Sequence, residues 1–347
     1  MPALRWSDVL APLMAGQDLS EDTAAAAMGA VMEGGATGAQ VAAFVTALRM
    51  KGESTAEVAG LVRAMRAAAL PVPLADSSEA LVDTCGTGGD RAGTFNVSTL
   101  AALVAAGAGA TVAKHGNRAA SGRCGSADLL EACGVVIDLP PADVAACIER
   151  VGIGFCFAPT FHPAMRYAMP ARRELGVPTI FNFLGPLTNP AGARHQTIGV
   201  SDPAMAPRMA SVLARLGTRH ALIFHGADGL DELTTTGPSQ VWEVRDGDVR
   251  EWRFDPAEHG LAPATVADLR GGDVRRNREI ADDVLAGKTG AARDIVLLGA
   301  AAALLAADRV ANWSDGLAAA ARAVDEGAAA SILEHWITTS RALADGS

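Results

Sequence analysis

The first seventy residues place apolar side chains at the spacing of amphipathic helices. Thr37 with Gln40, and Ser54 with Glu57, fit the capping-box pattern immediately before two such apolar segments. The stretch LPVPLADSS at 70–78 carries two prolines two residues apart, which resists both a helix and a central strand. The pattern therefore predicts a helical module that ends in a linker.

After the linker, short apolar segments alternate with longer amphipathic ones. The expected strands are 80–85, 110–116, 153–159, 196–200 and 220–226, and the expected helices are 97–109, 126–134, 141–152 and 203–217. Strands that alternate with helices predict a mostly parallel sheet with helices on both faces, which binds ligands at the carboxyl ends of its strands. Residues 240–254 predict a β-hairpin that turns near Asp246 and Gly247, and the chain from about 276 is mainly helical.

Together these segments predict an α/β protein. A small all-helical N-terminal domain precedes a larger α/β domain with a mostly parallel central sheet. The longest apolar run, from Ile295 to Ala307, has thirteen residues. Because about 20 are needed to span a bilayer, we expect a buried helix there and no membrane partner.

Composition and charge narrow the class of partner. The chain has 347 residues with 29 basic and 39 acidic side chains, a net charge of −10, and no Lys/Arg-rich run. Proteins that bind nucleic acid usually carry a basic surface patch. Because this chain lacks a basic run, we expect no nucleic-acid partner. The five cysteines are scattered without a C-x-x-C motif, which indicates reduced thiols rather than disulfides or a zinc site. The first residues show no signal peptide, and we expect a cytoplasmic protein.

A glycine-rich loop, CGTGGD at 85–90, lies between an expected strand and an expected helix. Glycines let backbone N–H groups approach a phosphate, and the N-terminus of the next helix favours an anion. The loop is not a Walker motif, and Arg91 stands where the dinucleotide fingerprint needs glycine. An ordinary glycine-rich turn between strand and helix is the alternative interpretation. Hydroxyls and an amide follow it at Thr94, Asn96, Ser98 and Thr99.

A second polar loop, KHGNRAASG at 114–122, follows the next expected strand. Lys114, His115 and Arg118 can neutralise phosphate charge there, and Asn117 offers both a donor and an acceptor. A solvated basic turn is the alternative interpretation.

Adjacent carboxylates, Asp231 and Glu232, follow the expected strand 220–226. Mg²⁺ typically takes one or two protein carboxylates and completes its shell with water and phosphate oxygens. An acidic surface turn is the alternative. With the two loops, this pair predicts a pyrophosphate-bearing ligand held with Mg²⁺.

The stretch 161–176 predicts one helix that carries three arginines. Arg166 and Arg173 are seven apart and share a face, whereas Arg172 is rotated by about 100°. One of the two orientations can offer a guanidinium to a carboxylate in bidentate geometry. A solvated cationic face is the alternative.

Seven motifs taken in order resemble the anthranilate phosphoribosyltransferases of tryptophan biosynthesis. They are CGTGGD, NVST, KHGNRAASG, GSADLLEACG, HPAMRYAMPARRELG, FNFLGPLTNP and HGADGLDELTTTG, and they span nearly the whole chain. The resemblance implies transfer of the phosphoribosyl group from phosphoribosyl pyrophosphate (PRPP) to anthranilate, the second step of tryptophan synthesis from chorismate. It also implies a fold like that of the nucleoside phosphorylases. Residues 1–74 with about 168–190 would form the helical domain, and 75–167 with 191–347 the α/β domain. A homodimer would form through the helical part.

The same resemblance implies a set of site residues. The PRPP site would comprise Gly86, Gly89, Asp90, Thr94, Asn96, Val97, Ser98, Thr99, Lys114, His115, Gly116, Asn117, Arg118, Ala119, Ala120, Ser121, Gly122 and Ser126. Anthranilate would contact Gly86, His115, Asn117 and Arg172, and magnesium, as two ions, would bind Ser98, Asp231 and Glu232. Lys114 would act electrostatically, and no side chain is assigned as a nucleophile.

Three positions depart from the family pattern. Arg91 stands where many members have glycine, and Gly122 and Cys124 stand where many have serine. Two other functions stay open at this point: a pyrimidine nucleoside phosphorylase-like enzyme, and a catalytically silent relative that binds nucleic acid or a protein partner.

Overall fold

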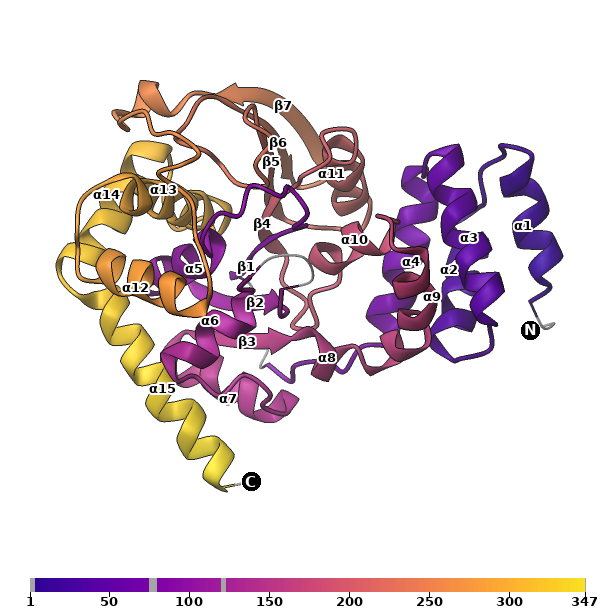
Figure 1. The fold of residues 1–347 in the computed structure, drawn as a ribbon, viewed down its shortest axis with the longest axis horizontal. Coiled ribbons are helices and arrows are strands. Elements are labelled where there is room, and N and C mark those ends of the chain that lie inside the picture. The colour runs from indigo at the N-terminus through magenta and orange to yellow at the C-terminus, as the bar shows by residue number, and fades with distance from the viewer. Residues whose placement is uncertain (1–3, 75–79, 120–122, 347) are drawn as a thin grey trace.

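Four N-terminal helices form a bundle at one end of the molecule, on the right in Figure 1. The structure is a computed structural model that describes residues 4–74, 80–119 and 123–346. The bundle comprises α1 (Trp6–Met14), α2 (Glu21–Met32), α3 (Gly38–Lys51) and α4 (Thr55–Ala67). Both predicted capping boxes are confirmed, at Thr37 before α3 and at Ser54 before α4.

A seven-stranded sheet forms the centre of the larger part. Its strands are β1 (Leu81–Gly86), β2 (Thr111–Gly116), β3 (Ile153–Phe157), β4 (His195–Gly199), β5 (His220–Gly226), β6 (Ser239–Arg245) and β7 (Asp248–Phe254). The order is β3-β2-β1-β4-β5-β6-β7. The first five strands are mutually parallel, and β6 and β7 are each antiparallel to the strand before them. The predicted hairpin is confirmed, and Asp246 and Gly247 have φ of 48° and 94°, as a tight hairpin turn requires.

The strand order reverses between β1 and β4. The chain runs outward from β1 through β2 to β3 and then returns to the other side of β1 as β4. Such a reversal opens a crevice at the carboxyl ends of the two central strands, where α/β sheets bind ligands. Gly86 and Gly199, paired at the ends of β1 and β4, mark this place.

Helices cover both faces of the sheet, as the sequence predicts. The helices that follow the bundle are α5 (Val97–Gly107), α6 (Ser126–Cys133), α7 (Pro141–Val151), α8 (Ala158–Phe161), α9 (Met169–Leu175), α10 (Phe181–Leu184), α11 (Ala206–Arg215), α12 (Val274–Leu285), α13 (Ala291–Ala306), α14 (Trp313–Asp325) and α15 (Ala328–Gly346). Short 3₁₀ segments are η1 (Pro163–Tyr167), η2 (Gly185–Leu187) and η3 (Pro256–His259).

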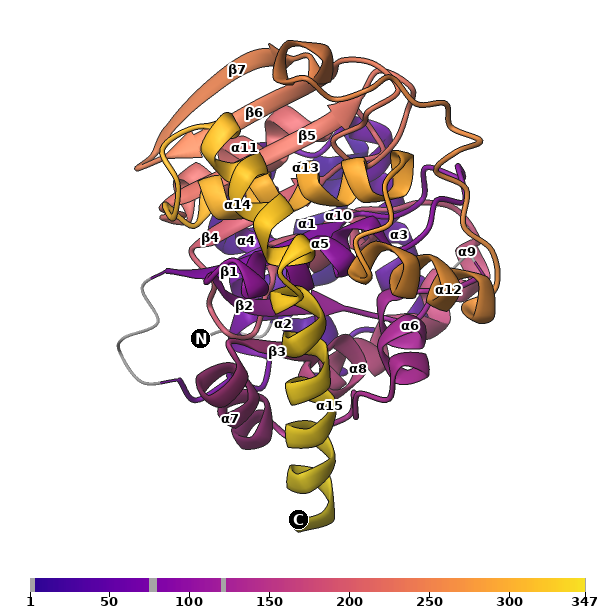
Figure 2. The same ribbon diagram turned by 90° about the vertical axis from the view of Figure 1, so that its left-hand side faces the viewer.

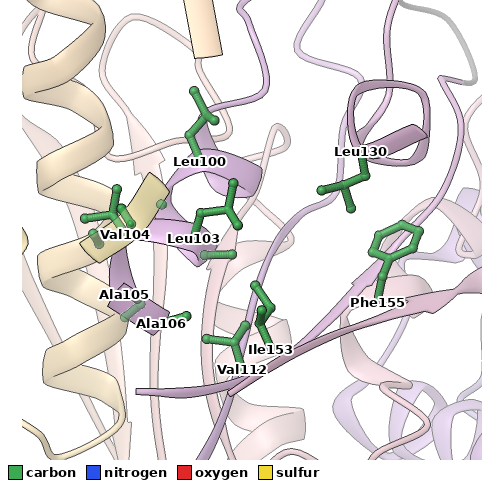
Figure 3. Close-up of a cluster of buried hydrophobic side chains, with 14 of the residues drawn as sticks. Leu100, Leu103, Val104, Ala105, Ala106, Val112, Leu130, Ile153 and Phe155 are labelled. Atoms are coloured by element: carbon green, nitrogen blue, oxygen red, sulfur yellow. The ribbon is translucent and has the colours of Figure 1, made fainter. Parts of the chain in front are cut away.

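One hydrophobic core lies between the sheet and the helices α5, α6, α7, α12, α13 and α15. In Figure 3, Leu103 of α5 lies near Val112 of β2 and Ile153 of β3, so α5 packs directly on the strands. Helix α13 is buried, as its apolar run predicts. In Figure 2, α15 runs down the face of the molecule that is turned to the viewer, and Figure 1 shows that the bundle lies on the other side. No helix within the described ranges is long and apolar enough to cross a membrane.

A second core joins the bundle to the opposite face of the sheet. It combines Phe44 and Leu48 of α3 with Ala171 of α9, Phe183 of α10 and Ile198 of β4. The segment around 168–190 therefore packs with the N-terminal helices although it follows β3 in sequence. This packing supports the predicted grouping of that segment with residues 1–74.

The prediction of one helix over 161–176 is wrong. The chain forms α8, the 3₁₀ segment η1 and α9 in turn, and the predicted strand 153–159 ends at Phe157. Pro163 begins η1 and Pro170 lies in the first turn of α9. Proline is tolerated in a first turn and disrupts a helix interior. Arg166 and Arg173 consequently lie in different elements and share no helix face.

Candidate active site

The glycine-rich loop and the carboxylate pair meet at the reversal between β1 and β4. Gly88 N–H donates to Oδ2 of Asp231 at 2.7 Å. A Cβ at Gly86 would lie 2.5 Å from the same oxygen, so only glycine lets the end of β1 approach this carboxylate. Gly89 has a φ of 88°, which also favours glycine. The structure thus joins two predicted motifs that are about 140 residues apart in sequence.

Three carboxylates gather in this crevice. Burial raises the pKa of Asp231 to about 7, and the charge of Asp90 acts in the same direction. Burial and the charge of Asp231 raise the pKa of Glu232, although Ser98 N–H donates to its carboxylate. Oδ2 of Asp90 is buried without a hydrogen-bond donor among the described residues. Desolvated acids so close together attract a cation.

The carboxylates do not form a complete metal site by themselves. Within 4–74, 80–119 and 123–346, no group of three or more His, Cys, Asp or Glu side chains is arranged to hold a metal ion. This incomplete ligand set fits Mg²⁺, which usually takes further oxygens from water and substrate phosphates.

Lys114 lies beneath the loop rather than on a surface turn. It is 2% exposed, and its Nζ donates to the Thr84 carbonyl at 2.6 Å and to Oγ of Ser98 at 3.4 Å. Burial lowers its pKa, while the charges of Asp83 and Glu232 oppose that shift. The ammonium group therefore offsets the acidic crevice from below and holds Ser98 in place.

His115 is buried in the next position of β2. Its N–H donates to Oδ1 of Asp83 at 3.0 Å, and its Nδ1 donates to the Gly185 carbonyl at 3.1 Å. Burial and the nearby ring of His162, 5.0 Å between centroids, lower the pKa of His115 to about 3. This shift disfavours a charged imidazole at pH 7, and the role of His115 toward a phosphate stays a prediction.

The loop after β2 is held by its own polar contacts. The Asn117 carbonyl accepts Oγ–H of Ser126 at 3.1 Å, and Oδ1 of Asn117 accepts Arg118 N–H at 2.8 Å. The Arg118 guanidinium is paired with Asp128 and Glu131. Gly116 and Ala119 lie in the described part of the loop, whereas Ala120, Ser121 and Gly122 lie outside the described residues. Arg118 is thus already neutralised within the protein, which leaves its role toward a ligand a prediction.

The first turn of α5 faces the carboxylates. Asn96 is its N-cap residue, and the Ser98 carbonyl accepts Oγ1–H of Thr84 at 3.0 Å. Val97 and Thr99 are buried, and their backbone N–H groups donate to the carbonyls of Phe95 and Asn96, so their roles toward a ligand stay predictions. Thr94 forms an isolated bridge with Arg270.

Arg172 differs from its two neighbouring arginines. It is half-buried on α9, burial lowers its pKa, and its guanidinium has no hydrogen bond or ion pair to another described residue. Arg166 lies on the Tyr167 ring and donates to its hydroxyl, while Arg173 is exposed. Arg172 is therefore the arginine available for a ligand carboxylate.

The sequence prediction misses residues that hold the two loops of the site in position. Asp83 is fully buried on β1 and contacts the start of the second loop. Oγ–H of Ser201 donates to the Gly88 carbonyl at 2.8 Å, which fixes the glycine loop from the end of β4. Asp83 could have been found from the sequence, because it is a carboxylate within an apolar strand. A buried carboxylate rarely occurs without a hydrogen-bond donor or a cation beside it.

Two of the unusual positions have visible consequences. Arg91 has a φ of 59°, a left-handed conformation that favours glycine, so a glycine there would carry no backbone strain. Sγ of Cys124 lies 3.4 Å from Oδ1 of Asn96, so the thiol contacts the N-cap residue of α5.

The raised pKa of Asp231 predicts that magnesium binding depends on pH. The folded protein holds this proton more tightly than the unfolded chain, so its contribution to stability is present below about pH 4 and is lost as pH rises toward 7. Mg²⁺ competes with the proton, and it should raise the thermal unfolding midpoint more at pH 8 than at pH 6. Thermal unfolding with millimolar Mg²⁺ and with EDTA measures this, and an equal rise at both pH values would contradict it.

Known proteins are similar to this chain in sequence and in fold over nearly its whole length. Sequence profiles of the glycosyl transferase family match residues 7–69 as its helical bundle domain and 78–330 as its a/b domain. Anthranilate phosphoribosyltransferase of Acidothermus cellulolyticus is 58% identical over 343 residues, covering 97% of this chain and 96% of the relative. That of Roseiflexus sp. (strain RS-1) is 56% identical over 336 residues, covering 96% and 98%.

Solved structures agree. The crystal structure of anthranilate phosphoribosyltransferase from Thermus thermophilus superposes with a TM-score of 0.91 at 44% identity, covering 96% of this chain and 99% of the other. The enzyme from Saccharomyces cerevisiae in complex with PRPP and Mg gives 0.88 at 27% identity, covering 97% and 98%. With two domain profiles in order and identities above half over almost its full length, the chain belongs to the anthranilate phosphoribosyltransferase family.

Proposed function

We propose that the protein transfers the phosphoribosyl group of PRPP to the amine of anthranilate, giving N-(5-phosphoribosyl)anthranilate and pyrophosphate. This is the second step of tryptophan synthesis from chorismate. The contact between Gly88 and Asp231 carries the proposal, because it places the glycine-rich loop and the acidic pair in one crevice. The membership of the chain in its family supports the same activity.

The residues present fit Mg²⁺ bound together with PRPP. Asp231 and Glu232 supply carboxylate oxygens, Ser98 supplies a hydroxyl, and Asp90 adds negative charge. When bound, Mg²⁺ would neutralise the pyrophosphate leaving group. Lys114 adds a fixed positive charge from beneath Ser98, and the N–H of Gly88 in the glycine loop donates to the Asp231 carboxylate beside it.

Bond cleavage at the ribosyl carbon develops oxocarbenium character, as glycoside cleavage does. We assign no protein nucleophile, because the aniline amine attacks with its own lone pair. His115 is neutral and buried, so it orients anthranilate without adding charge. Arg172 holds the anthranilate carboxylate, and burial of both groups strengthens that pair.

Changing Arg172 to alanine should raise KM for anthranilate by about 30-fold, with KM for PRPP changed by no more than about twofold. The physical reason is loss of a charge-assisted pair to one substrate only. Steady-state kinetics with each substrate varied in turn measures the effect. Arg173→Ala is the matched control, since Arg173 is the exposed neighbour on the same helix and should behave as the wild type.

The function itself is tested by the fluorescence of anthranilate. A decay that requires protein, PRPP and Mg²⁺ together, and that stops with EDTA, supports the transferase. No decay with folded protein would overturn it. Phosphorolysis of pyrimidine nucleosides and tight, salt-sensitive binding to DNA test the two other functions, neither of which has a specific observation in its favour.

Three further assignments belong to this proposal: a cytoplasmic location, a helical domain formed by 1–74 with about 168–190, and a homodimer through that domain. Met14 and Met50 support the dimer, because these apolar side chains of the bundle are 81% and 84% exposed. Light scattering on the purified protein tests the dimer, and Met50→Lys should shift it toward the monomer.

A further inference from the structure

A chain of hydrogen bonds links three separate segments around the glycine loop. Asn277, in the first turn of α12, is 2% exposed and uses both ends of its carboxamide. Its Oδ1 accepts Gly272 N–H at 2.7 Å, and its Nδ2 donates to Oδ1 of Asn96 at 2.9 Å. Asn96 in turn donates from Nδ2 to the Cys124 carbonyl at 3.1 Å.

The two ends of this series of hydrogen bonds fix the orientation of the side-chain amides of Asn277 and Asn96. It starts at a backbone N–H, of Gly272, and ends at a backbone carbonyl, of Cys124. Neither group can exchange donor for acceptor. Turning over the Asn277 amide would set two donors against each other at Gly272 and two acceptors against each other at Asn96. Asn277 and the Cys124 carbonyl therefore fix together which way Asn96 faces.

Backbone hydrogen bonds also join the segment before Asn277 to the loop between β1 and α5. Gly271 N–H donates to the Gly93 carbonyl at 2.9 Å, and Phe95 N–H donates to the Leu269 carbonyl at 3.3 Å. A Cβ at Gly271 would lie 2.8 Å from Cα of Phe95, so the two segments are in close contact. The segment 269–277 thus braces the loop between β1 and α5, while α12 itself packs against α6 (Figure 2).

This arrangement makes Asn96 a donor toward a ligand. Its Oδ1 already accepts from Asn277 and from the Cys124 thiol, at 2.9 and 3.4 Å. One Nδ2 hydrogen is used by the Cys124 carbonyl, and the second has no partner among the described residues. A donor at the N-terminus of α5 suits the oxygens of a phosphate or a ribose hydroxyl.

We propose that Asn277 is a positioning residue for PRPP, which acts by fixing the amide of Asn96 with an N–H toward the substrate. The inference rests on the proposed function, because Asn96 is expected to contact PRPP. Asn277 itself touches no substrate.

The test uses Asn277→Asp, which keeps the size and the acceptor for Gly272 N–H. The carboxylate has no hydrogen to donate to Asn96. That amide must either keep its oxygen against the new carboxylate or turn over and place its oxygen against the Cys124 carbonyl, so its present orientation loses support. We expect KM for PRPP, and its dissociation constant by calorimetry with Mg²⁺, to rise about 10-fold. KM for anthranilate and kcat should change by no more than about twofold. Asn277→Ala should act in the same direction.

Arg278→Ala is the matched control. Arg278 is the next residue of α12 and donates to the Ala132 carbonyl and to Asp282, so it contributes to docking of α12 without touching Asn96. Its constants for PRPP should match the wild type. Unchanged PRPP constants in Asn277→Asp, or equal losses for both substrates and for Arg278→Ala, would overturn the proposal.

The outcomes separate this inference from the proposed function. If the wild type turns over anthranilate and the variant is unaffected, only the role of Asn277 fails. If the wild type binds PRPP without using anthranilate, the transferase fails and the calorimetric constants still decide the role of Asn277. If the wild type does not bind PRPP, both are overturned.

Discussion

Replacing Lys114 with methionine is expected to lower kcat/KM by about 1,000-fold and the free energy of unfolding by about 3 kcal/mol. Lys114 is 2% exposed, and its charge opposes a group of acids that includes Asp83 and Glu232. Without it these acids lose their buried counter-charge, and Ser98 loses a hydrogen-bond donor. Chemical denaturation measures the stability, and the fluorescence assay measures the rate on the folded fraction.

Lys51→Met separates the two effects of the Lys114 change. The Lys51 side chain is 5% exposed and pairs with Asp18 and Glu57 in the bundle, far in sequence from the crevice. Its loss should reduce stability and leave kcat/KM of the folded protein near that of the wild type. If Lys114→Met lost activity only in proportion to its unfolded fraction, Lys114 would have a structural role alone.

The larger elements follow from hydrophobic periodicity because their boundaries are set locally. The strand predicted at 220–226 coincides with β5, and the hairpin turns at Asp246 and Gly247 as expected. The failure at 161–176 also has a local cause, since Pro163 and Pro170 divide the arginine-rich stretch. Amphipathic spacing alone does not predict that break.

The site was harder to predict, because burial is a tertiary property. Lys114 and His115 look like surface cations in the sequence, yet β2 lies between β1 and β3 and both side chains are buried. Burial lowers the pKa of His115 and so favours its neutral form. It also places the charge of Lys114 close to the buried acids Asp83 and Glu232. Asn277 shows the same limit, since nothing near it in sequence indicates contact with Asn96.

Asp231→Asn is expected to change activity and stability in opposite directions. The amide keeps the shape of the side chain and its acceptor for Gly88 N–H, but it removes a magnesium ligand and one negative charge. We expect kcat/KM to fall about 100-fold, with a higher Mg²⁺ concentration needed for half-maximal rate. Magnesium titration of the initial rate measures both.

Without magnesium, the same variant should be more stable than the wild type at pH 8. The wild-type carboxylate is then ionised against burial and against the charge of Asp90, which raise its pKa to about 7. Asparagine removes that repulsion, so the thermal midpoint in EDTA should rise, and the difference should shrink at pH 5, where Asp231 is protonated. Parallel losses of stability and activity would show that the carboxylate is needed for folding. Opposite signs for Lys114→Met and Asp231→Asn are what a crevice with excess negative charge requires, because one change removes the counter-charge and the other removes an acid.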